Sequence, residues 1–103
     1  MDLVGLKERL KGYKREDIII TEHAELQALT RDISLNEIKE DIVNPVRLVY
    51  AKEEDAKNPD EEKYDCYFAY SKHLYHRYIL VLNSKILIVT IIKINRDWQK
   101  SIG

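Results

Sequence analysis

The chain has little cysteine, glycine or proline. Its single cysteine, Cys66, cannot form an intrachain disulfide. Because structural disulfides belong to oxidising compartments, this composition favours a reducing, cytoplasmic setting. Three glycines and two prolines in 103 residues leave little material for flexible linkers. We therefore expect a single domain over residues 1–103.

Long apolar runs are scarce as well. The most apolar stretch, residues 86–92, has seven residues, whereas a membrane-spanning helix needs about 20. Residues 1–17 mix acidic and basic side chains without an apolar segment, which is not typical of a signal peptide. The sequence therefore predicts no membrane association.

Motifs for metals and cofactors are also missing. Cys66 has no second cysteine at a ligand spacing, and His73 and His76 form no recognised zinc pattern with Asp65. The chain has no glycine-rich phosphate loop and no G-x-S-x-G elbow. We expect neither a metal ion nor a cofactor.

What the chain does contain is charge and apolar residues in quantity. Hydrophobic residues make up 45% and charged residues 34%, as in a globular but highly charged protein. Many isoleucines, lysines and glutamates would suit a thermophile. Residues 1–70 carry a net charge of −6 and residues 71–103 a net charge of +5. The basic part could present a cationic surface to an anion such as RNA, or the two parts could simply attract each other.

Apolar periodicity predicts three helices before residue 45. Leucines at helical spacing indicate a helix over residues 3–12, and Thr21 is a suitable N-cap for a helix over residues 21–31. Ser34 and Glu37 form the S-x-x-E pattern of a capping box, and that helix should end at residues 44–45, an Asn-Pro pair. The β-branched run Ile18–Ile20 favours a short strand.

After residue 45 the spacing of apolar residues changes from a helical period to a period of two, as in β-strands. Residues 46–50 favour a strand, and residues 52–63 an acidic loop. Residues 64–95 predict a three-stranded antiparallel meander with a tight turn after residue 82. The sequence thus predicts an α+β fold, in which N-terminal helices pack on an antiparallel sheet of about four strands. Residues 1–17 would be a helical extension of a core formed by residues 18–95.

Several residues could carry chemistry. His23 stands in the first turn of its helix, where the helix dipole disfavours imidazolium, as a general base requires; it could equally be an ordinary polar residue at a helix start. Arg77 projects from a largely apolar strand face and could hold a phosphate, or mark the solvent-exposed end of a half-covered strand. Thr90 is most simply a good β residue. Lys93 and Arg96 would form a basic rim.

The order of several sequence fragments resembles a small uncharacterised domain family. The fragments are I-I-T-E-H-A at residues 19–24, R-D-I-S at 31–34 followed by E-I at 37–38, N-P at 44–45 and V-T-I-I at 89–92. They cover residues 18–94. That family is grouped with the RelE/ParE and BrnT-like toxins, whose helices pack on an antiparallel sheet.

The resemblance implies a metal-independent endoribonuclease that cleaves RNA by 2′-OH attack and is often paired with an antitoxin protein. His23, Arg31 and Thr90 match the family pattern by position, and Arg77 is inferred from its strand alone. We expect His23 to act as base or acid, Arg31 or Arg77 to hold the phosphate, and Thr90 to donate a hydrogen bond to it.

Three residues are predicted to bind RNA outside the catalytic set: Tyr70, Lys93 and Arg96. The tyrosines could stack on bases or serve as core packing. Two alternatives remain at this point. The same fold could be a non-catalytic module that holds a partner protein, with the acidic loop as its interaction surface. The tyrosine-rich meander could also pair two copies into a homodimer.

Overall fold

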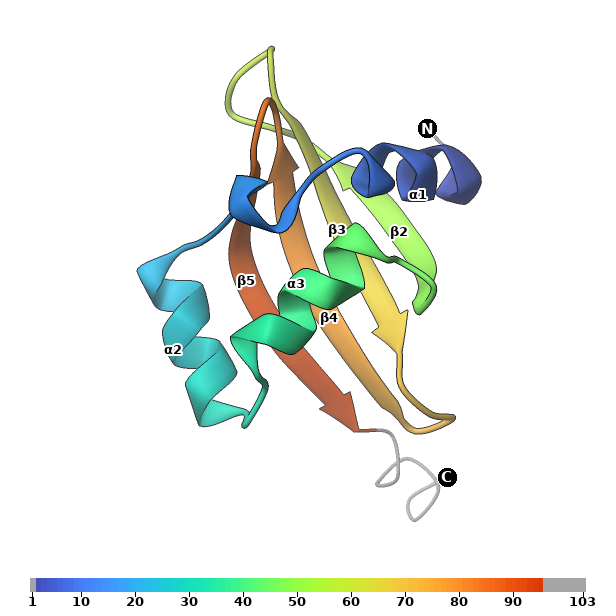
Figure 1. The fold of residues 1–103 in the computed structure, drawn as a ribbon, viewed down its shortest axis with the longest axis vertical. Coiled ribbons are helices and arrows are strands. Elements are labelled where there is room, and N and C mark those ends of the chain that lie inside the picture. The colour runs from blue at the N-terminus through green and yellow to red at the C-terminus, as the bar shows by residue number, and fades with distance from the viewer. Residues whose placement is uncertain (1, 96–103) are drawn as a thin grey trace.

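The computed structural model describes residues 2–95, and Figure 1 shows its fold. Its elements are helix α1 (Leu3–Lys11), the 3-10 turn η1 (Arg15–Asp17), strand β1 (Ile18–Ile20), helices α2 (Glu22–Thr30) and α3 (Leu35–Val43), and strands β2 (Leu48–Glu54), β3 (Glu62–Ala69), β4 (Leu74–Leu82) and β5 (Ile86–Asn95). The predicted α+β class is confirmed. Arg96, which was predicted to bind RNA, lies outside the described residues.

The strands form one sheet in the order β1-β5-β4-β3-β2. Strands β3, β4 and β5 pair antiparallel in sequence, which confirms the predicted meander, and β2 adds to β3. Strand β1 pairs in parallel with β5, with Ile18 opposite Ile86. The sheet is therefore mixed and has five strands rather than the expected four antiparallel ones. A parallel pair is possible here because helices α2 and α3 and strands β2 to β4 separate β1 from β5, which is more than the dozen residues that a crossover connection needs.

The β2–β3 hairpin is longer than predicted. Strand β2 continues to Glu54 and β3 begins at Glu62, so the predicted acidic loop over residues 52–63 shortens to residues 55–61. Lys52 lies opposite Asp65 and Glu54 opposite Lys63. Such opposite-charge pairs stabilise a strand conformation that composition alone assigns to a loop.

A β-bulge in β5 changes which side chains face the helices. Ile79 pairs with Thr90 while the next residue, Leu80, pairs with Ile88, so Val89 is an extra residue in the ladder. Before the bulge Ile88 is fully buried, and after it Ile91 is. Strict alternation would have placed these two isoleucines on opposite faces.

The helices begin and end close to the predicted residues. The Thr21 hydroxyl accepts a hydrogen bond from the Ala24 amide at 3.1 Å, which confirms the N-cap of α2. Helix α3 ends at Val43, directly before the Asn-Pro pair. The Ser34 side chain makes no cap hydrogen bond, so the predicted capping box is not formed. Ser34 is exposed, and water can serve the free amides of that first turn.

The core lies between the helices and one face of the sheet (Figure 1). Leu6 and Leu10 of α1 are buried there, so residues 1–17 contribute directly to the same core. None of the helices in residues 2–95 covers the opposite face, which we call the open sheet face (Figure 1). Side chains on this face alternate with those on the core face along β2 to β5, and they include Tyr50, Lys52, Lys63, Asp65, Tyr67, Arg77, Ile79, Val81, Leu87, Thr90 and Ile92. Of these, Asp65 is buried. Over residues 2–95, the helices are too short or too polar to cross a lipid bilayer.

Candidate functional site

Helix α2 lies along the edge of β5 that β1 leaves unpaired. The Thr21 amide donates to the Ile88 carbonyl at 3.1 Å. Six residues further along the helix, the Ile91 amide donates to Oε1 of Gln27 at 2.9 Å. The two bonds span about 9 Å of helix and about 10 Å of strand, so α2 and β5 run side by side between them. The Gln27 side chain thereby satisfies a donor that an edge strand would otherwise expose.

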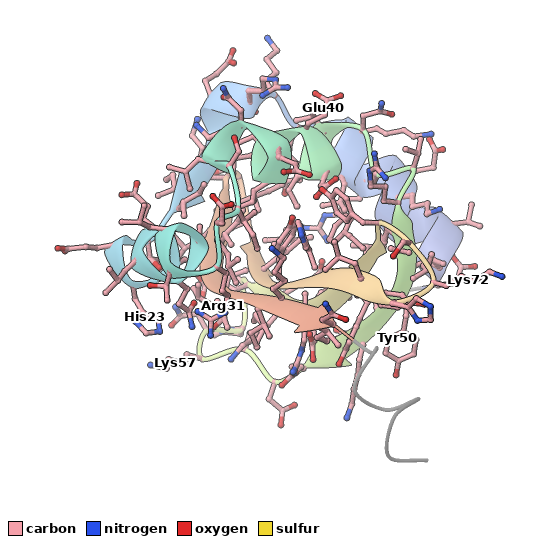
Figure 2. The ribbon with its side chains drawn as sticks, turned by 90° about the horizontal axis from the view of Figure 1, so that it is seen from below. His23, Arg31, Glu40, Tyr50, Lys57 and Lys72 are labelled. Carbon is pink, nitrogen blue, oxygen red and sulfur yellow. The ribbon has the colours of Figure 1, made fainter. Side chains whose placement is uncertain are left out.

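His23 lies on α2 between Thr21 and Gln27, the two residues that make these bonds. It is exposed, and it shares one side of α2 with Gln27 and Arg31 because the three are four residues apart. Figure 2 shows His23 and Arg31 projecting from α2 on the side away from Glu40 of α3. Two helical turns, about 12 Å, separate His23 from Arg31.

Arg31 is held at the end of α2. Its Nη1 donates to the Gln27 carbonyl at 3.3 Å, and its own carbonyl accepts from Nζ of Lys93 at 3.1 Å. Arg31 and Lys93, two predicted site residues, therefore meet at one end of the contact between α2 and β5, which we call the α2–β5 seam.

Arg77 and Thr90 are neighbours on the open sheet face. Arg77 pairs with Ile92, and Thr90 with Ile79, so the two side chains occupy diagonal positions on β4 and β5. Side chains at such positions are about 7–8 Å apart. The predicted catalytic residues Arg77 and Thr90 thus share a surface. His23 instead lines a groove on α2 together with Leu26 and Leu29.

The guanidinium of Arg77 is fixed by Asp65. Nε donates to Oδ1 at 2.7 Å and Nη2 donates to Oδ2 at 2.6 Å, a bidentate pair. These hydrogen bonds raise the pKa of Arg77, so its charge persists at every physiological pH. The Asp65 carboxylate is almost buried. Two of the five guanidinium donors are used, and three remain to contact a ligand. Cζ of Arg77 lies 5.4 Å from the centre of the Tyr67 ring.

A pocket of about 310 Å³ opens on the same face, where the loop over residues 55–61 reaches across the sheet. Its floor is apolar and its rim is polar, and the lining residues are Ala56, Lys57, Asn58, Glu61, Lys63, Val81, Leu87 and Val89. Val89 directly precedes Thr90, so the pocket adjoins the Arg77–Thr90 pair. An apolar floor with two ammonium groups at the rim suits a planar aromatic ring attached to an anionic group.

A second polar cluster lies on the covered face, within the core. The hydroxyls of Tyr70 and Tyr78 both donate to Oδ2 of Asp41, the latter at 2.7 Å, and Nδ1 of His76 lies 3.0 Å from the Tyr78 hydroxyl. Burial raises the pKa of Asp41 and of both tyrosines, and it lowers the pKa of His76. Arg47 stacks on the Tyr70 ring, with Cζ 4.3 Å from its centre.

Tyr70, predicted to bind RNA, therefore faces the helices and is bonded to Asp41, away from the open sheet face. The sequence indicated no connection between His76 and Asp41. Tyr78 makes that connection by joining α3 to β4 across more than thirty residues, and no local pattern reports it. Lys57 and Lys63 belong to residues 52–63, which the sequence predicted only as an acidic loop.

Among residues 2–95, no group of three or more His, Cys, Asp and Glu side chains is arranged to hold a metal ion. The chain matches no protein-family model, no curated protein and no solved structure. The resemblance to a toxin-like domain family therefore rests on the sequence fragments alone.

Proposed function

We propose that this protein is a metal-independent endoribonuclease of RelE/ParE-like fold that binds single-stranded RNA on its open sheet face. The observation that supports the proposal is the pair formed by Arg77 and Thr90 on the open sheet face, where Thr90 lies diagonally across from the guanidinium that Asp65 fixes. Helix α2, which runs beside β5, carries His23 as an exposed side chain. A hydroxyl and a cation therefore share one face of the sheet, and in this proposal the His23 imidazole reaches the same RNA strand from α2.

Each of these groups has a role in cleaving a phosphodiester. The His23 imidazole accepts the proton of a ribose 2′-OH, and the 2′ oxygen attacks the adjacent phosphorus. The bond from phosphorus to the 5′ oxygen breaks, and that oxygen leaves with a proton from solvent. Arg77 and Thr90 donate hydrogen bonds to the phosphoryl oxygens as negative charge builds on them. The products are a 2′,3′-cyclic phosphate and a free 5′-hydroxyl.

The surface around these groups suits the rest of an RNA strand. The pocket beside Thr90 takes a nucleobase on its apolar floor, with Lys57 and Lys63 placed for the flanking phosphates. Tyr50 and Tyr67 form an edge-to-face pair 5.5 Å apart on the open sheet face, and a further base can stack on the exposed Tyr50 ring.

The test is cleavage of a labelled single-stranded RNA in EDTA. We expect a 2′,3′-cyclic phosphate product and no cleavage when a 2′-deoxy residue replaces the nucleotide on the 5′ side of the cut. His23→Ala should lower the rate by at least about a hundredfold, as for loss of a general base. Lys57→Ala should raise KM with little change in kcat, because it contacts flanking phosphate only.

Two controls keep the result specific. Arg77→Lys retains a cation but loses the bidentate geometry, and it should lower kcat while urea unfolding shows that the variant is folded. Lys72→Ala removes an exposed cation from the β3–β4 turn, at the other side of the molecule from Lys57 in Figure 2, and should change nothing. Intact RNA after incubation with the wild-type protein, or full activity in His23→Ala, refutes the proposal.

A further inference from the structure

Helix α2 exposes its leucines and buries its alanines. Ala24 and Ala28 are 0% and 1% exposed against the sheet, whereas Leu26 and Leu29 are 62% and 78% exposed. At 100° per residue the two alanines share one side of the helix and the two leucines share the other. The small alanines allow α2 to approach β5 closely, which leaves the larger apolar side chains without a partner among residues 2–95.

The exposed leucines form one wall of a groove. The groove has a volume of about 740 Å³ and continues past the end of α2 to Ile33 and Leu35 at the start of α3. Leu35 is also exposed, at 37%. Four apolar side chains therefore line the groove, contributed by α2, by the turn after it and by the start of α3. Isolated exposed leucines are common on protein surfaces, but a contiguous apolar trough marks an interaction site.

The charges that line this groove indicate what kind of partner it can bind. Its polar lining residues are Glu22, His23 and Glu25, and α2 carries no lysine or arginine. A second copy of the chain docked through the same helix would bring four carboxylates together without a cation from either α2. An amphipathic helix with an apolar stripe and lysine or arginine flanks instead pairs its stripe with the leucines and its flanks with the two glutamates.

We propose that the α2 groove binds a basic amphipathic helix of a partner protein; its lining residues are Glu22, His23, Glu25, Leu26, Leu29, Ile33 and Leu35. The proposal does not rest on the RNA chemistry assigned to the open sheet face, although His23, the base proposed for that chemistry, also lines the groove. It also differs from the interaction surface predicted from sequence, because the acidic residues involved lie on α2 rather than in the loop before β3.

The first test uses designed helical peptides as probes. Three capped peptides of about 15 residues, long enough to span α2, are titrated into the full-length protein and followed by fluorescence anisotropy and by backbone amide NMR shifts. One has leucines at helical spacing with lysine flanks, the second has the same leucines with glutamate flanks, and the third has lysine flanks without leucines. We expect the first to bind at least about tenfold more tightly than the other two, with shifts concentrated on α2 and the start of α3.

Protein variants then distinguish binding in the groove from nonspecific hydrophobic binding elsewhere on the surface. Leu26→Ser with Leu29→Ser should weaken the lysine-flanked peptide about tenfold or more, while Val4→Ser, at an equally exposed apolar position on α1, should not. Glu22→Lys with Glu25→Lys should reverse the preference in favour of the glutamate-flanked peptide. All of these side chains are exposed, and thermal unfolding checks that each variant is folded.

Three outcomes would overturn the proposal. One is the absence of saturable binding to the lysine-flanked peptide. Another is equal affinity for both leucine peptides, or affinity that survives the double serine substitution. The third is sedimentation showing a wild-type dimer that Leu26→Ser with Leu29→Ser converts to a monomer, because the occupant would then be a second copy.

Discussion

Replacing Arg77 with methionine tests how the open sheet face is held together. The substitution keeps the aliphatic stem of the side chain but removes both hydrogen bonds to the Asp65 carboxylate. The Asp65 side chain is 6% exposed and the Arg77 side chain 30% exposed, so the variant leaves an almost buried carboxylate without its cation.

The expected loss in the free energy of unfolding follows from the difference in exposure between the two side chains. Breaking a fully buried ion pair by removing one partner costs about 3–5 kcal/mol. Solvent already reaches the Arg77 side of the pair and can partly hydrate the freed carboxylate, so we take the cost as about 2–3 kcal/mol. Asp65→Asn with Arg77→Met removes both charges, and the double variant should be more stable than Arg77→Met alone. The resulting coupling energy between the two sites should be about 1–2 kcal/mol.

Urea unfolding at pH 7, followed by far-UV circular dichroism, measures the four members of this cycle. Lys52→Met serves as a matched control, because Lys52 faces Asp65 from β2 but is exposed. We expect that control to lie within about 0.5 kcal/mol of the wild type. An Arg77→Met variant as stable as the wild type, or a coupling energy near zero, would refute the view that Asp65 fixes the guanidinium.

Three further predictions concern the core and the α2–β5 seam. Tyr78→Phe removes a hydrogen bond to the buried Asp41 carboxyl, and calorimetry should show a loss of about 2 kcal/mol; a change below 0.5 kcal/mol would contradict the network. Burial lowers the pKa of His76 below 6.5, so the unfolded chain binds more protons and the free energy of unfolding should fall as pH drops below about 6.5, by at most about 1.4 kcal/mol per pH unit. In His76→Gln the free energy of unfolding should depend less on pH. If urea titrations at several pH values show the same slope as the wild type, His76 is not the group responsible. Gln27→Met removes the acceptor of the Ile91 amide, so hydrogen exchange at that amide should accelerate at least about tenfold, whereas exchange as slow as in the wild type would mean that Gln27 does not protect the edge.

Local patterns accounted for most of the elements of this fold. The leucines of α1, the Thr21 cap and the Asn-Pro stop after α3 act within a few residues of each other, and each element begins or ends close to where these signals place it. The meander is equally local, because tight turns connect β3, β4 and β5. Features that depend on distant partners were missed, notably the parallel pairing of β1 and the bulge at Val89.

In the candidate site, too, individual residues could be predicted from local sequence, whereas contacts between distant residues could not. His23 and Arg77 could be selected by residue type and position in their own elements, whereas Thr90 was selected through the family resemblance. The sequence could not reveal that Asp65 would hold Arg77, because the pair forms across two strands and twelve positions. Nor could it reveal which side of α2 would be buried, since alanines and leucines alternate along that helix and only the partner surface decides between them.

Strand β1 connects these observations. Only three residues long, it pairs with the first part of β5 and delivers Thr21 to the Ile88 carbonyl, one residue before α2 begins. That hydrogen bond sets the height of α2 along β5, and the Gln27–Ile91 bond sets its rotation. Together they hold α2 beside β5 and leave His23, Leu26 and Leu29 exposed. Both proposed surfaces therefore depend on a parallel strand that the sequence indicated only as a short β-branched run.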